Sequence, residues 1–289
     1  RIGGSSGAVT GLVDIGGGTV NLGPVLLATN STSGGSAAVG TLNLHGGTIT
    51  MSGNIARGGG AGPAVASLLM TNNAVLDMGG FNIGSAASPI DTLRLDSGTL
   101  RNVGEINGGA AWTKNGSGTL AIEGVNTYAG NLTVAAGTLR YNGTYTGGGL
   151  IAVQSGAKLA GTGTVGAVVV SAGGAVEPGN SAGTLTMGDL TLDGGATLAY
   201  ELGLASDKII AGVPDLGGID FDNFTFLVGV GFGPGVYTLI DASAISSLGA
   251  GTTGTVGGYD AELSIDMDKQ DLVLTIIPEP GTLGLYGSL

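Results

Sequence analysis

Short segments of alternating apolar and polar residues recur along most of this chain, and glycine, asparagine, serine or aspartate separates nearly every one from the next. Alternation with a period of two is typical of a β-strand that buries one face and exposes the other. The stretch 111–139 shows it best, with segments at Thr119–Ile122, Leu132–Val134 and Thr138–Leu139. Strands this short cannot each enclose a core, so they must stack on one another. The sequence therefore predicts an all-β protein.

The spacing of the segments, roughly 6–12 residues, suits either a β-sandwich or a β-solenoid. A solenoid is favoured because the segments are short and alike and continue past the size of a usual sandwich. Aromatic residues make up only 4% of the chain, and a narrow solenoid core prefers small aliphatic side chains. We therefore predict a parallel β-solenoid over residues 1–205. We also expect an extruded loop at residues 55–70, with a helical turn at Val65–Met70.

The pattern changes after residue 205. Segments within residues 206–277 are longer and richer in phenylalanine and tyrosine. We expect them to form a C-terminal β cap, because the last coil of a solenoid exposes an edge that needs cover. Asp268-Lys269-Gln270 is expected to close the last hairpin, and Ala242–Leu248 to form a helical turn. Residues 278–289 are treated as a separate tail.

The net charge restricts the partners of the chain. It is −12, from 21 acidic and nine basic residues. This balance opposes binding to nucleic acid or to an anionic membrane, since both require clusters of lysine and arginine. No stretch approaches the roughly 20 apolar residues that a membrane-spanning helix needs. Cysteine is absent, which excludes disulfides and thiol chemistry.

Candidates for catalysis are few. His45 is the only histidine, so a Ser-His-Asp triad or a histidine-rich metal site would depend on it. Its place beside two glycines indicates instead an exposed residue at a turn. Two pairs of carboxylates could serve a polysaccharide-degrading enzyme, namely Asp91 with Asp96 and Asp189 with Asp193. Aspartates at strand ends, however, commonly accept backbone hydrogen bonds.

Two acidic clusters resemble parts of calcium-binding loops. They consist of Asp266, Asp268 and Asp271, and of Asp220, Asp222 and Asn223. The first lacks the central glycine and the closing glutamate of such a loop and falls on a predicted hairpin. We therefore predict a non-enzymatic protein with no catalytic residue, no metal and no cofactor.

One stretch resembles a known family. The residues W-T-K-N-G-S-G-T-L at 112–120, followed by N-T-Y-x-G at 126–130 and L-T-V-x-x-G-T-L at 132–139, are similar to the autotransporter-associated β-strand repeat. The segment at 177–186, E-P-G-N-S-A-G-T-L-T, agrees more loosely with a coil of such passengers. Residues 207–210 and 237–241 resemble the segment that ends them. The resemblance implies a right-handed parallel β-helix that is exported to the cell surface.

A second resemblance lies near the end of the chain. Ile277 to Leu283, with Pro278, Glu279 and Pro280 at its centre, is similar to the start of a PEP-CTERM sorting signal. Such signals imply a Gram-negative bacterium and an extracellular or cell-surface address. A full signal continues into an apolar span and a basic tail, so we expect the sequence that stops at Leu289 to be truncated or processed.

These observations favour a structural protein that joins copies of itself. The end of a solenoid presents unpaired backbone groups, and a neighbouring copy can satisfy them by strand addition. A head-to-tail contact of this kind yields a fibre, a surface layer or a biofilm matrix. The predicted joining residues are Ile2, Val9, Leu12, Val13 and Ile15 at one end, and Leu272, Leu274 and Ile276 at the other.

Two alternatives remain from other classes. The first is a monomeric surface adhesin that binds a surface polysaccharide on a flat face of the solenoid. Its aromatic ladder for sugar stacking would consist of Trp112, Tyr128, Tyr141 and Tyr145. The second is a β-helix enzyme that degrades polysaccharides.

Overall fold

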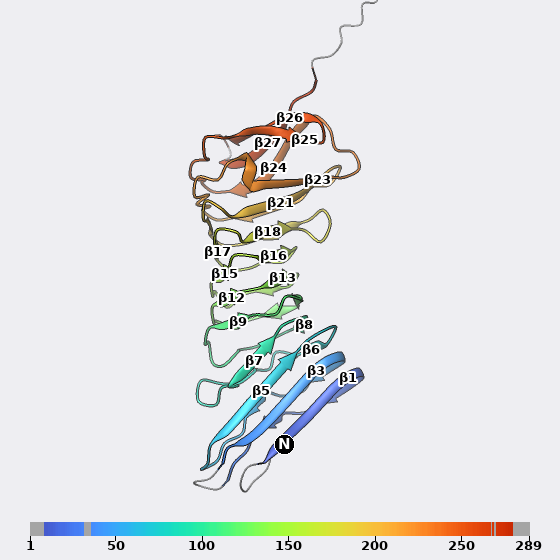
Figure 1. Ribbon diagram of the computed structural model, residues 1–289, viewed down its shortest axis with the longest axis vertical. Coiled ribbons are helices and arrows are strands. Elements are labelled where there is room, and N and C mark those ends of the chain that lie inside the picture. Colours follow the sequence, from blue (N-terminus) through green and yellow to red (C-terminus); the bar gives the residue numbers. More distant parts are fainter. Residues whose placement is uncertain (1–8, 32–35, 267, 269, 280–289) are drawn as a thin grey trace, which may run out of the picture.

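The computed structural model describes residues 9–31, 36–266, 268 and 270–279. These residues form a rod of stacked coils, with β1 at one end and β24–β27 at the other (Figure 1). Within them the only helical element is one 3-10 turn, η1 (Phe221–Asn223). Most strands pair in parallel with the strand of the next coil, so the predicted all-β parallel solenoid is confirmed.

The first face of the rod is the longest sheet. Its strands follow one another in the order β1 (Thr10–Leu22), β3 (Ala38–Met51), β6 (Val75–Asp77), β8 (Gly98–Arg101), β10 (Thr119–Glu123), β13 (Gly137–Tyr141), β16 (Ala157–Gly161), β18 (Ala175–Pro178), β21 (Thr197–Leu202) and β23 (Phe224–Val228). On β3 a second branch begins, through β5 (Ala64–Met70) to β7 (Thr92–Leu95).

Two further faces lie beside the first. The second consists of β9 (Trp112–Lys114), β12 (Leu132–Val134), β15 (Ile151–Val153), β17 (Val168–Val170) and β20 (Leu190–Leu192). The third contains β2 (Val25–Leu27) with β4 (Ile55–Arg57), then β11 (Val125–Asn126) with β14 (Thr144–Tyr145), and then β19 (Thr184–Thr186) with β22 (Lys208–Ala211) and β24 (Gly235–Ala242).

The core is built from columns of inward side chains that run along the rod. Leu120 lies beside Leu139, which lies beside Leu159, and Leu159 lies beside Val176. All of these side chains are fully buried. Each apolar side chain buried from water contributes roughly 1.5–3 kcal/mol. Since each coil covers the apolar faces of its neighbours, the stability of one coil depends on the next.

Gly137 shows why glycine is needed at one corner of the coil. Its φ is 66°, a left-handed conformation that side chains with a Cβ rarely adopt. A Cβ at this position would also lie only 2.5 Å from the carbonyl oxygen of Gly118 and 2.6 Å from that of Gly116. The backbone of one coil thus approaches the next directly at this corner.

The predicted loop at 55–70 is wrong over most of its length. Residues 55–57 form β4 and residues 64–70 form β5, and only residues 58–63 between them belong to no strand. β5 pairs with β3 on one side and β7 on the other. The predicted helical turn at Val65–Met70 lies inside β5, where Ala66, Leu68 and Met70 are buried. Period-two burial and two paired edges stabilise the strand despite the glycine-rich residues before it.

At the C-terminal end the pairing becomes antiparallel. β24 pairs with β27 (Asp271–Ile276), which pairs with β26 (Tyr259–Asp266), which pairs with β25 (Thr253–Val256). The predicted last hairpin is confirmed, because Asp266 lies beside Asp271. Parallel pairing continues beyond residue 205 through β22 and β23, so the boundary between solenoid and cap stays a prediction.

The predicted helical turn at Ala242–Leu248 is also wrong. β24 ends at Ala242, and the residues after it form no helix. The Ser243 N–H donates to the Gly212 carbonyl at 3.0 Å, and the Ser246 N–H donates to the Pro214 carbonyl at 3.2 Å. These backbone groups bond to the preceding coil, so they are not available for a local helical turn.

Replacing Leu139 with alanine should lower the free energy of unfolding by about 2–5 kcal/mol, because it leaves a cavity in the core column of Leu120, Leu139 and Leu159. Thr138→Ala is the matched control, since Thr138 precedes Leu139 on β13 but is only partly buried. Urea unfolding followed by circular dichroism measures both variants. An equal loss of unfolding free energy in the two variants would contradict the inward orientation of Leu139.

Candidate functional site

The predicted N-terminal joining residues lie on or next to an edge strand. β1 is hydrogen-bonded to β3 alone among the strands described. Leu12 is 63% exposed, whereas Val13 and Ile15 are partly buried against the core. Val9 precedes β1, and its carbonyl accepts a hydrogen bond from the Val39 N–H at 2.9 Å. Ile2 lies outside the described residues.

The predicted C-terminal joining residues do not form a surface. Leu272, Leu274 and Ile276 are each at most 1% exposed. They belong to β27, which is paired with β24 on one edge and β26 on the other. Neither their side chains nor their backbone can therefore receive another copy, and this part of the prediction is corrected.

The predicted sorting motif is only partly described. Pro278 and Glu279 follow β27 and are exposed, and Pro280 lies outside the described residues. Its role in sorting stays a prediction.

The predicted aromatic ladder is in the interior of the rod. Trp112 and Tyr128 meet edge to face with centroids 6.0 Å apart, and Tyr128 packs on Tyr145 at 5.0 Å. Tyr145 also contacts Tyr141 at 6.3 Å. All four are at most 7% exposed. They fill the core and cannot stack on a sugar, so this part of the adhesin prediction is corrected.

Lys114 occupies a core position that sequence reasoning left unassigned. On the second face its column continues as Val134, Val153 and Val170. The ammonium nitrogen donates to the carbonyls of Gly116 at 2.6 Å and Ala136 at 2.8 Å, and thereby joins the corner of one coil to the next. Burial lowers the pKa of Lys114, and the charge of Asp96 opposes that shift.

His45 lies within β3 and not at a turn. Its Nε2 atom is 3.3 Å from Asp14 Oδ1, and its side chain is 39% exposed. Asn43 donates to the same Asp14 oxygen at 2.6 Å. His45 and Asn43 therefore partner the acidic residue of β1 from the neighbouring strand.

Three of the four carboxylates in the predicted pairs have separate structural partners. Asp91 binds Arg57 at 2.8 Å and accepts the Ala66 N–H, while Asp96 binds Arg94. Asp189 accepts the Val213 N–H at 3.1 Å. These contacts tie neighbouring segments together and match the role of turn aspartates.

The calcium-like clusters also form local caps. Asp220 caps η1, where its carboxylate accepts the Asp222 N–H and the Asn223 side chain accepts the Asp220 N–H. Asp266 accepts the Asp268 N–H at 3.0 Å within the hairpin. Across the described ranges, no three acidic or histidine side chains gather closely enough to hold a metal ion.

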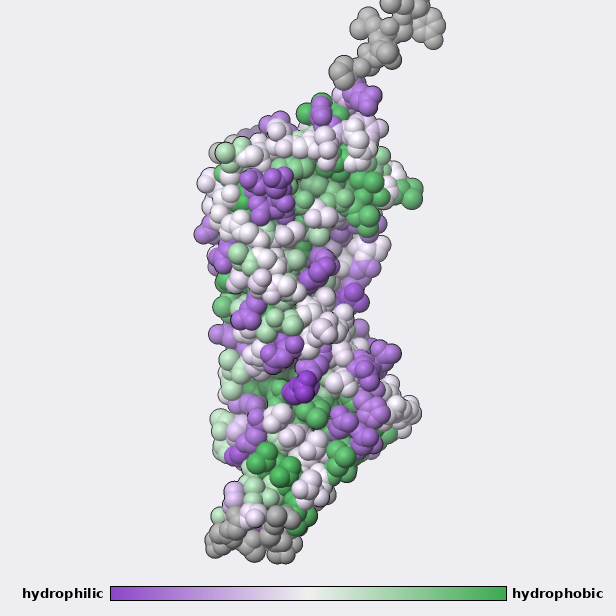
Figure 2. All heavy atoms as spheres, in the orientation of Figure 1, coloured by the Kyte–Doolittle hydropathy of each residue, from purple (hydrophilic) through white to green (hydrophobic). Residues whose placement is uncertain are grey.

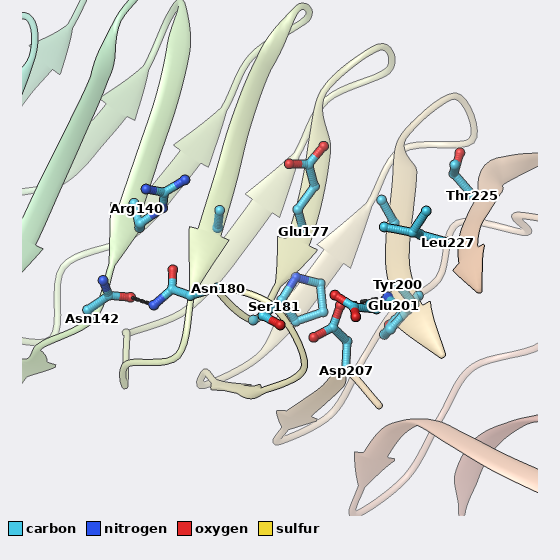
Figure 3. Close-up of a pocket in the computed structure, with 14 residues that line it drawn as sticks. Arg140, Asn142, Glu177, Asn180, Ser181, Tyr200, Glu201, Asp207, Thr225 and Leu227 are labelled. Atoms are coloured by element: carbon cyan, nitrogen blue, oxygen red, sulfur yellow. Dashed lines mark hydrogen bonds between the residues drawn. The ribbon is translucent and has the colours of Figure 1, made fainter. Parts of the chain in front are cut away.

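An open groove with a mixed polar and apolar lining crosses the outer surface of the first face (Figure 3). Its volume is about 590 Å³, and its lining comes from β13, β16, β18, β21 and β23. Arg140, Glu177 and Thr225 lie along one side, and Asn142, Asn180 and Glu201 along the other. Sequence reasoning missed this groove, because only the register between strands brings these residues together.

The loop after β18 shapes one wall of the groove. Asn180 donates to Asn142 Oδ1 at 2.8 Å, which holds the loop against the preceding coils. Beneath it, the Asp207 carboxylate accepts the N–H groups of Gly183 at 2.9 Å and Glu201 at 2.6 Å. Burial raises the pKa of Asp207, and these backbone donors oppose the shift. Gly179 has φ 90° and leaves room for this carboxylate, since a Cβ there would lie 2.1 Å from it.

An exposed apolar area lies at the C-terminal end of the rod (Figure 2). Leu204 and Val230 are each 85% exposed. They lie on adjacent turns, because the Leu204 N–H donates to the Val230 carbonyl at 2.9 Å. No helix in the described part of the chain has the length and hydrophobicity to cross a bilayer.

Coils that stack in parallel around inward aliphatic columns place the protein in the class of parallel β-solenoids. Residues 113–140 match the Passenger-associated-transport-repeat family, which confirms the resemblance to autotransporter repeats over that segment.

Two curated relatives agree with this match. The chain is 38% identical over 110 residues to an extracellular serine protease of Serratia marcescens, and 36% identical over 107 residues to the adhesin BmaC autotransporter of Brucella suis. These matches cover 37% and 36% of this chain, and 10% and 3% of the two relatives. The chain thus spans a tenth or less of the relatives that it matches.

Replacing Tyr200 with phenylalanine should preserve or raise stability at neutral pH, because the buried Tyr200 hydroxyl has no hydrogen-bond partner among the described residues. Burial raises the pKa of Tyr200 well above 10.0. The folded state therefore keeps this proton where the unfolded state loses it, so stability falls as the pH rises above 10.

The variant should lose less stability in that alkaline range than the natural chain does. Urea unfolding at neutral pH and above pH 10 measures the difference, with the partly exposed Tyr259→Phe as control. An unchanged alkaline loss in the Tyr200 variant would contradict the assignment.

Proposed function

We propose that this chain is a non-enzymatic structural protein of the cell surface or extracellular space of a Gram-negative bacterium. The family match and the two surface or secreted relatives support that address. The proposed role is self-association into a fibre, a surface layer or a biofilm matrix. The single observation that carries it is the unpaired second edge of β1, which has no partner among the described strands.

The chemistry of β1 suits strand addition. It is a long strand of 13 residues, and Asp14 is its one charged side chain. Edge strands are commonly protected by charge or by short length, because bare backbone groups pair with other chains. Here Asn43 and His45 of β3 partner the Asp14 carboxylate, so that protection is weak.

A head-to-tail polymer also needs a surface at the C-terminal end. Since β27 is interior, the exposed Leu204 and Val230 are the apolar side chains proposed for that contact. Burying them against the exposed Leu12 of another copy would remove apolar surface from water, which favours association.

The second candidate function is a monomeric surface adhesin. The 107-residue similarity to an adhesin and the groove on the first face favour it. A monomeric chain that retains glycan binding would support this candidate over the polymer.

Leu12→Pro should abolish self-association without removing the β1–β3 ladder. Val9 directs its carbonyl toward β3, and backbone groups of successive residues point to opposite edges of a strand, so the Leu12 N–H points away from β3. Proline removes that donor and is tolerated on edge strands. Leu12→Ala is the matched control, because it shortens the side chain and keeps the N–H.

Negative-stain electron microscopy and sedimentation velocity measure the result. The natural chain should assemble, and Leu12→Ala should assemble less tightly, because it keeps the N–H and loses only side-chain contact. Leu12→Pro should stay monomeric with an unchanged β circular dichroism spectrum. Assembly of Leu12→Pro like the natural chain, or a monomeric natural chain at all concentrations, would overturn the proposal.

A further inference from the structure

The groove on the first face is shaped for an extended chain that runs along the rod. It crosses five neighbouring strands, from Arg140 on β13 to Thr225 and Leu227 on β23. At a strand separation of about 4.8 Å, four spacings give a length of about 19 Å. Ala160 pairs with Arg140 on one side and Glu177 on the other, and Ala199 pairs with Thr225, so these two small side chains leave low points in the row of Arg140, Glu177 and Thr225.

The backbone beneath the groove is already occupied. β16, β18 and β21 are interior strands of the sheet, and β18 and β21 pair with each other at Ala175–Val176 and Thr197–Leu198. Farther along β21, the Glu201 N–H donates to the Asp207 carboxylate. A peptide that binds by strand addition requires a free edge strand, and none of these strands lies at an edge. A ligand here must be recognised by side chains, chiefly amides, hydroxyls and charged groups.

The charges of the lining restrict the ligand further. Glu177 forms an ion pair with Lys158, whereas Glu201 and Arg140 have no ion-pair partner within the described residues. Glu201 lies on β21 and Arg140 on β13, so these two free charges stand at different positions along the groove. The net charge of the whole chain is −12, which attracts cations and repels acidic polymers.

We propose that this groove binds a linear polysaccharide that carries free amino groups. An ammonium group of the ligand pairs with the Glu201 carboxylate, and hydroxyls bond to Asn142, Asn180 and Thr225 along the walls. The methyl groups of Ala160 and Ala199 contact the C–H faces of the sugar rings. The inference does not rest on self-association, because β1 contributes no residue to the groove.

Arg140 gives the proposal a second test, in which the expected change in affinity is opposite to that for Glu201. Its guanidinium repels an amine-bearing chain at one end of the groove, so its removal should strengthen binding. Removal of the Glu201 charge should weaken binding. A purely nonspecific attraction to an acidic protein would not separate Glu201 from any other exposed carboxylate.

The test uses isothermal titration calorimetry on the full chain. The ligands are a β-linked glucosamine pentamer, its fully N-acetylated counterpart and a galacturonate pentamer. The variants are Glu201→Gln, Arg140→Gln and Glu262→Gln. Glu262 lies exposed on β26, and its variant has the same change of net charge as Glu201→Gln, so it is the matched control. Each variant is checked for an unchanged β circular dichroism spectrum.

We expect the natural chain to bind the glucosamine pentamer and neither of the other two. Glu201→Gln should weaken that binding about tenfold, as the loss of one charged hydrogen bond does. Arg140→Gln should tighten it, and Glu262→Gln should leave it within about twofold, as an exposed charge outside the site does.

Equal binding of the acetylated or galacturonate pentamer would overturn the amine assignment. Equal weakening by Glu201→Gln and Glu262→Gln would show a nonspecific charge effect and overturn the site. Neither result changes the outcome expected for Leu12→Pro in the assembly test, so failure of this proposal is distinguishable from failure of the proposed self-association.

Discussion

The structure depends on one interaction, the parallel hydrogen-bonded ladder between successive coils. Each strand of the first face from β3 to β21 is paired on two sides, and the paired residues are those that align the core columns. The ladder and the core are therefore one constraint: a shift of register by one residue would turn Leu139 outward and break both. On the second and third faces, strands of successive coils are also joined by parallel ladders.

Two polar side chains enter the core at points where the coil itself satisfies them. Lys114 replaces the valine of its column and bonds to carbonyls at two corners. Asn126, which is fully buried, accepts the Val103 N–H and donates to the Glu123 carbonyl. These side chains join one coil to the next in the way that backbone bonds do elsewhere, and they mark the segment that matches the passenger repeat.

Local alternation was enough to predict the strands, because a period of two is a property of each strand alone, and the number and likeness of the short segments then favoured a solenoid. The same alternation indicates that Tyr141 is buried, because Tyr141 lies on the same side of β13 as Leu139. Neighbour identity was not predictable in this way. The sequence around Leu272 does not show whether its strand lies at an edge of a sheet. Only the strand order β24-β27-β26 shows that this strand is interior. The groove was missed for the same reason, since Arg140 and Glu201 are far apart in sequence and meet one surface only through the register of intervening strands.

The direction of the ladder has a mechanical consequence. Its hydrogen bonds lie along the length of the rod, and β1 and β27 are at opposite ends (Figure 1). Tension applied between those ends loads the coil boundaries in series, so the weakest boundary opens first and its neighbours remain closed. A rod of this construction lengthens stepwise under load, as a tether does, and does not fracture all at once.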